Sequence, residues 1–147
     1  MERKLILCRG IQGSGKTTWA EQYCKEHSNT IRLNRDDIRS MFSQKWSEEL
    51  EHIVKHTEYM GMIAALSNGM DVVVDDVSNL SKQTRELIEF YISQMHHPEV
   101  VKIVNQDFFI PLQVCIDRDS LRANPIGEKK VTMTYNMYKT IIEGKDI

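Results

Sequence analysis

The fold of this chain is decided by one stretch near its start, Leu5-Ile6-Leu7-Cys8-Arg9-Gly10-Ile11-Gln12-Gly13-Ser14-Gly15-Lys16-Thr17-Thr18. An apolar run typical of a buried β-strand leads directly into a glycine-rich turn. Its glycines and the pair that ends it, Lys16 and Thr17, have the spacing of a Walker A motif. A helix expected over 17–26 then directs its positive N-terminal end at the same place. Both flanks therefore indicate a phosphate-binding loop rather than a chance glycine turn.

Each part of this loop has a distinct predicted role. The glycines let the backbone turn sharply, so that successive N–H groups point inward and surround an anion. Lys16 brings a positive charge to the β- and γ-phosphates of a nucleotide, and the Thr17 hydroxyl is placed to ligate Mg²⁺. The residues expected to contact ATP here are Gly10, Gln12, Gly13, Ser14, Gly15, Lys16, Thr17 and Thr18.

The composition is typical of one globular domain, expected over residues 1–147. Hydrophobic residues make up 41% and charged residues 27%, which leaves enough apolar surface for an ordinary core. The apolar run before Arg9 is too short for a signal peptide or a membrane span, so we expect a cytoplasmic protein. The net charge of −2 argues against coating long nucleic acid but leaves room for recognition of one strand end by a few arginines.

Three features that suggest other chemistry have simpler explanations. The cysteines, Cys8, Cys24 and Cys115, are odd in number and widely spaced, which indicates reduced thiols used in packing. His52 and His56 lie four apart on an expected helix but lack the glutamate of a zinc protease. The run 117–121 has the paired aspartates of a phosphatase, but its surroundings predict a helix where that site needs a strand end.

Strands and helices alternate along the rest of the chain. Strands are expected at 30–33, 71–75 and 100–104, and helices after Asn34, over 47–68, after Ser81, after Pro111 and over 131–143. The sequence therefore predicts an α/β fold with a parallel sheet of four or five strands, helices on both faces and a helical lid. The expected inner faces include Leu50, Ile53, Val54, Thr57, Gly61 and Ala64, then Leu87, Ile88, Tyr91, Ile92 and Met95, and finally Met133, Met137 and Ile141.

Polar residues are expected at one edge of this sheet, because ligands bind beyond the carboxyl ends of parallel strands. Phosphoryl transfer needs a group that accepts the proton of the acceptor hydroxyl. On a helix starting near Arg35, Asp36 and Arg39 face the same way and Asp37 points elsewhere, which favours Asp36 as the base. Arg35 and Arg39 could hold an anionic acceptor. The alternative is an exposed helix start with an ordinary ion pair.

Two further pairs are expected near this edge. Asp75 and Asp76 end a buried strand, where they could reach Mg²⁺ through water or brace an arginine; a solvated strand end is the simpler alternative. Arg118 and Arg122 are one helical turn apart, so both guanidinium groups could project from a lid onto nucleotide phosphates. An exposed basic helix face would explain them equally well.

With these residues in place, the chain resembles the 5′-kinase module of bacteriophage polynucleotide kinases, within the small P-loop kinases. The resemblance extends from the glycine-rich loop through Asn34-Arg35-Asp36-Asp37-Ile38-Arg39 to Arg118 and Arg122. It implies that Asp36 is the general base and that Arg39 holds the phosphate beside the acceptor nucleotide. It also implies that Lys16, Arg118 and Arg122 contact ATP phosphates, with Thr17 on Mg²⁺. The family's Asp-Thr-Asn-Leu segment corresponds to 76–80 with one extra residue, so Asp76 is preferred over Asp75.

The activity that the resemblance implies is Mg²⁺-dependent transfer of the γ-phosphoryl group of ATP to the 5′-hydroxyl end of DNA or RNA, as in nucleic acid end repair. Two alternatives stay open. A kinase for a small molecule, such as a nucleoside, modified base or sugar, would share every ATP-side residue, and a nucleotide-dependent binding module would give Asp36 no role. The expected catalytic residues are Lys16, Asp36, Arg39 and Arg122. The expected substrate-binding residues are Arg35, Arg39, Asp76 and Asn79.

Overall fold

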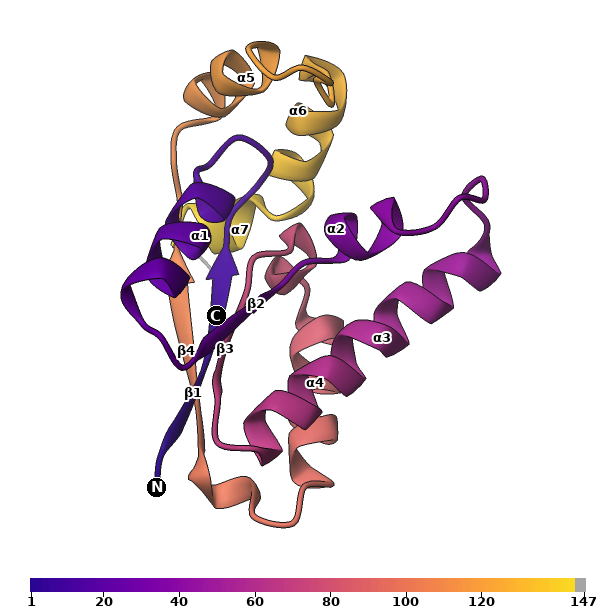
Figure 1. Ribbon diagram of the computed structural model, residues 1–147. Helices are drawn as coiled ribbons and strands as arrows, with labels where there is room; N and C mark the ends of the chain where they lie inside the picture. Colours follow the sequence, from indigo (N-terminus) through magenta and orange to yellow (C-terminus); the bar gives the residue numbers. More distant parts are fainter. Residues whose placement is uncertain (145–147) are drawn as a thin grey trace.

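A parallel sheet forms the centre of the structure, a computed structural model that describes residues 1–144 (Figure 1). Its strands are β1 (Arg3–Arg9), β2 (Thr30–Leu33), β3 (Asp71–Val74) and β4 (Val101–Asp107). They lie in the order β2-β3-β1-β4, and each neighbouring pair is parallel. The predicted α/β fold is confirmed, with four strands in the described part of the chain. Residues 145–147 of the expected domain lie outside it.

The register of the strands brings their carboxyl ends to one edge of the sheet. Leu7 of β1 and Leu33 of β2 both lie opposite Val74 of β3. The chain therefore leaves β1, β2 and β3 at nearly the same level. The glycine-rich loop, the start of the next helix and the two aspartates after β3 emerge side by side, as the strand-end rule predicts.

Helices cover both faces of the sheet. On one face, α1 (Lys16–Glu26) packs Trp19 and Ala20 against residues of β1 and β3. On the other face, α3 (Glu48–Ser67) and α4 (Lys82–Ser93) form the larger core with Leu5, Leu7, Val72 and Val74. Because successive strand residues point to opposite faces, one apolar strand serves both layers.

The inner faces of α3 and α4 differ in part from the prediction. Leu50 and Val54 are buried as expected, but Ile53 is 50% exposed. Thr57 and Ala64 are also exposed, and the buried side of α3 continues through Glu58, Tyr59, Met62, Ala65 and Leu66. In α4, Ile88 and Ile92 are buried, whereas Leu87 is largely exposed. The buried residues of each helix follow rows in which successive residues are four apart. The predicted inner faces also included residues that lie beside these rows, such as Ile53 and Leu87, and these are exposed.

The C-terminal part forms the expected helical lid, and the helix expected over 131–143 is divided into two. The helices are α5 (Leu112–Ser120), α6 (Glu128–Met137) and α7 (Lys139–Ile142), and Figure 1 shows α5 and α6 beyond the end of β1. The prediction that Met133 and Met137 face inward is wrong, since both are more than half exposed. Val131 is buried instead, in a cluster with Ile11, Leu80 and Cys115, so the lid packs on the glycine-rich loop rather than on the sheet.

Short elements complete the fold. They are α2 (Arg35–Ser40), η1 (Val77–Leu80) and η2 (Pro98–Val100). The side chains of Asn34, Ser47 and Ser81 cap α2, α3 and α4 by accepting a backbone N–H. In residues 1–144 no helix combines the length and apolar character needed to cross a membrane. The cytoplasmic location stays a prediction.

Candidate active site

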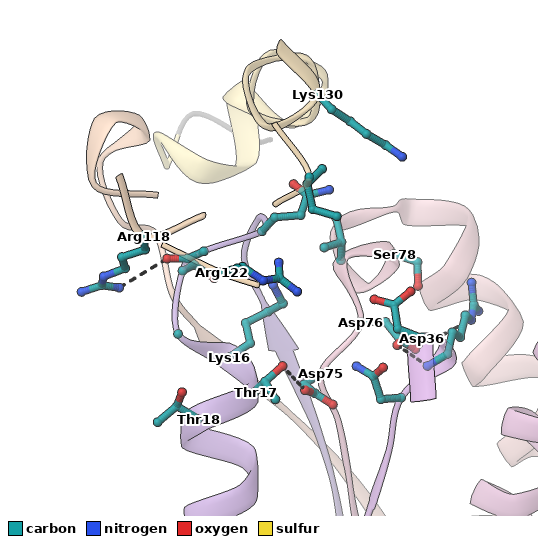
Figure 2. A pocket seen from close by; sticks show the side chains of 18 of the residues that line it. Lys16, Thr17, Thr18, Asp36, Asp75, Asp76, Ser78, Arg118, Arg122 and Lys130 are labelled. Atoms are coloured by element: carbon teal, nitrogen blue, oxygen red, sulfur yellow. Dashed lines mark hydrogen bonds and ion pairs between the residues drawn. The ribbon is translucent and has the colours of Figure 1, made fainter. Parts of the chain in front are cut away.

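A cleft of about 540 Å³ opens at the carboxyl edge of the sheet (Figure 2). The glycine-rich loop, the start of α2, the segment after β3 and the lid all contribute to its walls. The lining residues are Gln12, Gly13, Ser14, Gly15, Lys16, Thr17, Thr18, Asn34, Arg35, Asp36, Arg39, Asp75, Asp76, Val77, Ser78, Arg118, Arg122, Ile126 and Lys130. Most of the predicted site residues therefore meet in one place, and Gly10 and Asn79 are the exceptions.

The loop conformation depends on glycine at two positions. Gly13 and Gly15 have φ angles of +81° and +97°, which side-chain-bearing residues rarely adopt. A Cβ atom on Gly13 would also lie 2.4 Å from the carbonyl oxygen of Cys115 in α5. Ser14 is buried, and its hydroxyl has no hydrogen-bond partner within the described residues. The loop thus presents an unsatisfied polar group where the motif places phosphate.

Lys16 and Thr17 lie at the start of α1, on the cleft side. The buried Lys16 donates from Nζ to the carbonyl oxygen of Ile11 at 2.9 Å, and burial lowers its pKa to about 8. The Thr17 hydroxyl donates to Asp75 Oδ2 at 2.8 Å. Hydroxyl and carboxylate oxygens beside a phosphate loop are the hard donors that Mg²⁺ prefers, so the residues present fit the predicted ion.

Asp75 is braced by Arg32, a residue that belongs to none of the predicted site motifs. Arg32 donates from Nε to Asp75 Oδ1 at 3.1 Å and from Nη2 to Oδ2 at 2.9 Å. Its Nη1 donates to Asp37 Oδ2 at 2.5 Å, which explains why Asp37 faces away from the cleft. Asp75 was expected either to reach Mg²⁺ through water or to brace an arginine, and the structure shows the contact with an arginine. An arginine inside a short strand was the available signal, since buried arginines require partners.

Asp36 lines the same cleft as the glycine-rich loop, although its side chain is 85% exposed. Figure 2 shows Asp36 on one side of the cleft and Lys16 on the other. Arg39 donates from Nη1 to Asp36 Oδ1, so the two residues do share a side of α2. Arg39 also forms a two-pronged bond with Glu51 of α3, at 2.8 and 2.6 Å. These hydrogen bonds hold the pKa of Glu51 below its usual range.

Arg35 was expected to hold an anionic acceptor, but its guanidinium group is paired with other residues of the chain. The side chain is buried, with Nε donating to Glu58 Oε1 at 3.1 Å and Nη2 to the Tyr59 hydroxyl at 2.8 Å. Its backbone N–H donates to Asp76 Oδ1 at 2.8 Å. The structure thus gives Arg35 a bracing role under the cleft, because Glu58 lies on the buried side of α3.

Glu58 and Asp76 form a buried acid pair beneath the cleft. One oxygen of each, Glu58 Oε2 and Asp76 Oδ2, is buried without a hydrogen-bond partner in the described structure. A single proton held between the two carboxyl groups would satisfy both oxygens. Burial, then the hydrogen bond and charge of Asp76, raise the pKa of Glu58 to about 9, and burial also raises the pKa of Asp76. The pair therefore holds a proton at neutral pH.

This shared proton makes the stability of the fold depend on pH. As pH rises from 4.5 to about 9, the unfolded chain has released the Glu58 proton and the folded chain retains it. The free energy of unfolding therefore falls across this window, by at most about 1.4 kcal/mol per pH unit from this group. Glu58→Gln keeps a donor toward Asp76 and should flatten the dependence, as measured by urea unfolding at several pH values.

The exposed Glu49 provides the matched control, because it lies on the same helix and has no contact with Asp76. Glu49→Gln should leave the slope of stability against pH unchanged. A Glu58→Gln slope equal to that of the original chain would show that no proton is held between the two carboxyl groups.

The predicted lid arginines both line the cleft. Arg118 donates from Nη1 to the carbonyl oxygen of Gly13 at 3.4 Å. Arg122 Nη1 lies 3.6 Å from Asp119 Oδ1. Because α5 ends at Ser120, Arg122 lies beyond the helix, and the expectation that both arginines project from one face of a helix is wrong. The backbone N–H groups of Ile126 and Gly127 donate to Asp119, which fixes the connection that carries Arg122. Lys130 of α6 also reaches the cleft, and no sequence signal pointed to it.

Asn79 lies apart from the other predicted site residues. Its Nδ2 donates to the carbonyl oxygens of Cys8 and Val74, at 3.0 and 2.9 Å, and so ties β1 to β3. Asn79 does not line the cleft, and the contacts that the structure shows for it are structural; the expected substrate contact stays a prediction. Gly10 lies outside the cleft lining as well. A Cβ atom there would be 2.5 Å from Ser14 Oγ, so this glycine keeps the loop tight.

The other chemical features are placed as follows. The thiols of Cys8, Cys24 and Cys115 are free, and burial raises the pKa of Cys8 to about 12, which makes it unreactive. In the described part of the chain, no group of three or more His, Cys, Asp or Glu side chains is placed to hold a metal ion. Most of the run 117–121 belongs to α5 and does not end a strand.

Comparison with known proteins agrees with this fold. Residues 5–137 match the model of a family described as an AAA domain. A chain in the structure of the Pnkp1/Rnl/Hen1 RNA repair complex is 23% identical, with a TM-score of 0.81 over 99% of this chain and 47% of that one. A chain of a second Pnkp1/Rnl/Hen1 complex is 26% identical, with a TM-score of 0.68 over 80% and 39%.

A metabolite kinase shares the fold more distantly. Shikimate kinase from Acinetobacter baumannii, solved with shikimate, is 15% identical, with a TM-score of 0.55 over 99% of this chain and 80% of that chain. The present chain spans less than half the length of the two repair-complex chains. These likenesses establish a P-loop kinase-like fold, and they include both a nucleic acid repair complex and a metabolite kinase.

Proposed function

The chain belongs to the AAA domain family designated AAA_33, and from that premise we propose that it transfers the γ-phosphoryl group of ATP to the 5′-hydroxyl end of DNA or RNA. One observation carries the proposal: Asp36 and the loop that ends in Lys16 line a single cleft. The cleft thus contains both a carboxylate that could take the proton of the acceptor hydroxyl and a cation that could bind the phosphates of ATP. The resemblance of the 34–39 run to bacteriophage polynucleotide kinases, and the fold shared with an RNA repair complex, support this acceptor.

The proposed reaction is a direct displacement at phosphorus. The acceptor oxygen attacks the γ-phosphorus while Asp36 takes the hydroxyl proton. The new oxygen–phosphorus bond forms as the bond from the γ-phosphorus to the bridging oxygen breaks, and ADP leaves with that electron pair. Lys16, Arg118 and Arg122 hold the charge on the phosphates. The Thr17 hydroxyl would hold Mg²⁺, which would supply further neutralisation of this charge.

The neighbours of Asp36 suit the role of a base. Arg39 holds one carboxylate oxygen and is itself fixed by Glu51, so the carboxylate is oriented from α3. The high exposure of Asp36 leaves its other oxygen open to an incoming hydroxyl. Asp76, preferred over Asp75 from the sequence, supports the backbone of Arg35 at the start of α2, and its effect on the acceptor would be through the position of that helix.

A second candidate function is phosphorylation of a small-molecule hydroxyl, as on a nucleoside, modified base or sugar. One observation favours it: the arginines on the acceptor side, Arg32, Arg35 and Arg39, are already paired with carboxyl groups. A neutral acceptor would meet less repulsion there than a phosphate backbone. The fold shared with shikimate kinase fits this alternative too.

A transfer assay across acceptors separates the candidates. The chain is incubated with γ-labelled ATP, Mg²⁺ and, in turn, 5′-hydroxyl oligonucleotides of DNA and RNA, nucleosides, sugars and shikimate. The matched control is the same oligonucleotide already phosphorylated at its 5′ end. We expect label on the 5′-hydroxyl oligonucleotide and none on the control. Label on nucleosides or sugars alone would establish the second candidate, and ATP binding without transfer would indicate a binding module.

A further inference from the structure

The acceptor side of the cleft, formed by α2 and the segment after β3 together with the residues of β2 and α3 that pair with them, has an excess of carboxyl groups. Each of its three guanidinium groups is paired with two carboxyl groups. The pairs are Arg32 with Asp37 and Asp75, Arg35 with Glu58 and Asp76, and Arg39 with Asp36 and Glu51. Even with Glu58 protonated, this wall is negative, so it repels a phosphate group unless another cation offsets it.

Arg39 is the residue that the resemblance assigns to the acceptor phosphate, but its surroundings make it a weak anion site. All three nitrogens of its guanidinium group already donate to carboxylate oxygens of Glu51 and Asp36. A phosphate that approached Arg39 would approach both carboxylates at the same time. Since like charges at short distance repel, little net attraction is left for it.

Lys130 is a cation at this cleft without such a partner. Within residues 1–144 its ammonium group forms no hydrogen bond or ion pair, and it lines the cleft from α6. Figure 2 shows its side chain extending from α6 away from Arg118 and toward the side where Ser78 and Asp36 lie. One turn further along α6, Thr134 accepts a hydrogen bond from Gln12 of the glycine-rich loop at 3.4 Å, which ties this helix to the donor side.

We propose that Lys130 binds the phosphate on the 3′ side of the nucleotide that carries the reacting 5′-hydroxyl. The proposal rests on the function proposed above and assigns the acceptor phosphate to the lid instead of to Arg39. The minimal acceptor is then a nucleoside that bears a 3′-phosphate, and a nucleoside without it lacks the contact. The acceptor strand would run between α2 and α6, and Lys130 of the lid would neutralise part of its phosphate charge.

Kinetics with two matched acceptors test the assignment. The rate of transfer from ATP is measured with a nucleoside 3′-phosphate and with the same nucleoside lacking the phosphate. Lys130→Ala should raise KM for the nucleoside 3′-phosphate by about 10-fold and leave KM for ATP and kcat nearly unchanged. Lys130→Arg should restore most of the affinity. Lys129→Ala is the control, because Lys129 is the exposed neighbour on α6 and does not line the cleft.

Equilibrium binding of a fluorescent 5′-hydroxyl oligonucleotide gives a readout that does not need turnover. Lys130→Ala should weaken this binding and reduce its dependence on salt by about one counterion, whereas Lys129→Ala should not. If Lys130→Ala raises KM for ATP instead, or binds the oligonucleotide as well as Lys129→Ala does, the assignment is wrong. If the unaltered chain transfers phosphate only to sugars, the proposed function is wrong. The comparison of oligonucleotide binding by Lys130→Ala and Lys129→Ala then still shows whether Lys130 contacts a phosphate.

Discussion

Asp36→Asn is expected to lower the rate of phosphoryl transfer by about 100 to 10,000-fold, the range typical of losing a general base. Asparagine is close in size and keeps an oxygen toward Arg39, but it does not take the proton of the acceptor hydroxyl. Asp36 is exposed at the start of α2 and forms no contact with the phosphate loop, so ATP affinity should stay nearly unchanged. Single-turnover transfer and ATP binding are measured on the same preparation.

Asp37→Asn is the matched control for this substitution. It removes the same charge one residue along α2, from a carboxylate that faces Arg32 and does not line the cleft. Its rate should stay within a few-fold of the original chain. Full activity in Asp36→Asn, or equal losses in the two variants, would show that Asp36 is not the base.

Lys16→Ala is expected to reduce kcat/KM for ATP by roughly 100 to 1,000-fold, as when one preorganised charge donor is removed from a transition state. The ammonium group is held inside the loop by the carbonyl oxygen of Ile11, so it is in place before the nucleotide arrives. Burial lowers the pKa of Lys16 to about 8 and leaves most of the group charged at neutral pH. ATP affinity by calorimetry and initial rates give the two readouts.

The control for Lys16→Ala is Lys25→Ala, an exposed position at the other end of the same helix. Thermal unfolding of both variants shows whether removing the buried charge changes stability. A folded Lys16→Ala variant that binds ATP and turns over normally would place the donor phosphates somewhere other than the glycine-rich loop.

The parts of the fold that local sequence determines were predicted well. β1, the loop and α1 follow from an apolar run, glycine spacing and a helical segment. α2, α3 and α4 begin directly after Asn34, Ser47 and Ser81, where helices were expected to start. The lid was predicted less well. Met133 and Met137 were expected inside because apolar spacing alone does not reveal that α6 packs on the glycine-rich loop through Val131.

The candidate site was predictable in position but not in its contacts. The strand-end rule brought the loop, Asp36 and Asp76 to one edge, and they line one cleft. The partners of the charged groups come from distant parts of the chain, as with Glu51 and Glu58 of α3. Spacing carried one overlooked signal: Glu58 continues the row of Leu50 and Val54, which places a carboxyl group in the core and calls for a partner.

Identification of the product tests the central claim most directly, that one cleft joins a hydroxyl at Asp36 to the phosphates at Lys16. The chain is incubated with ATP, Mg²⁺ and a 5′-hydroxyl oligonucleotide, and the oligonucleotide is then analysed by mass spectrometry and nuclease digestion. We expect one added phosphoryl group, located on the 5′ oxygen, and almost none with Asp36→Asn or Lys16→Ala. An unaltered oligonucleotide, under conditions where the same preparation phosphorylates a sugar or a free nucleoside, would contradict the claim.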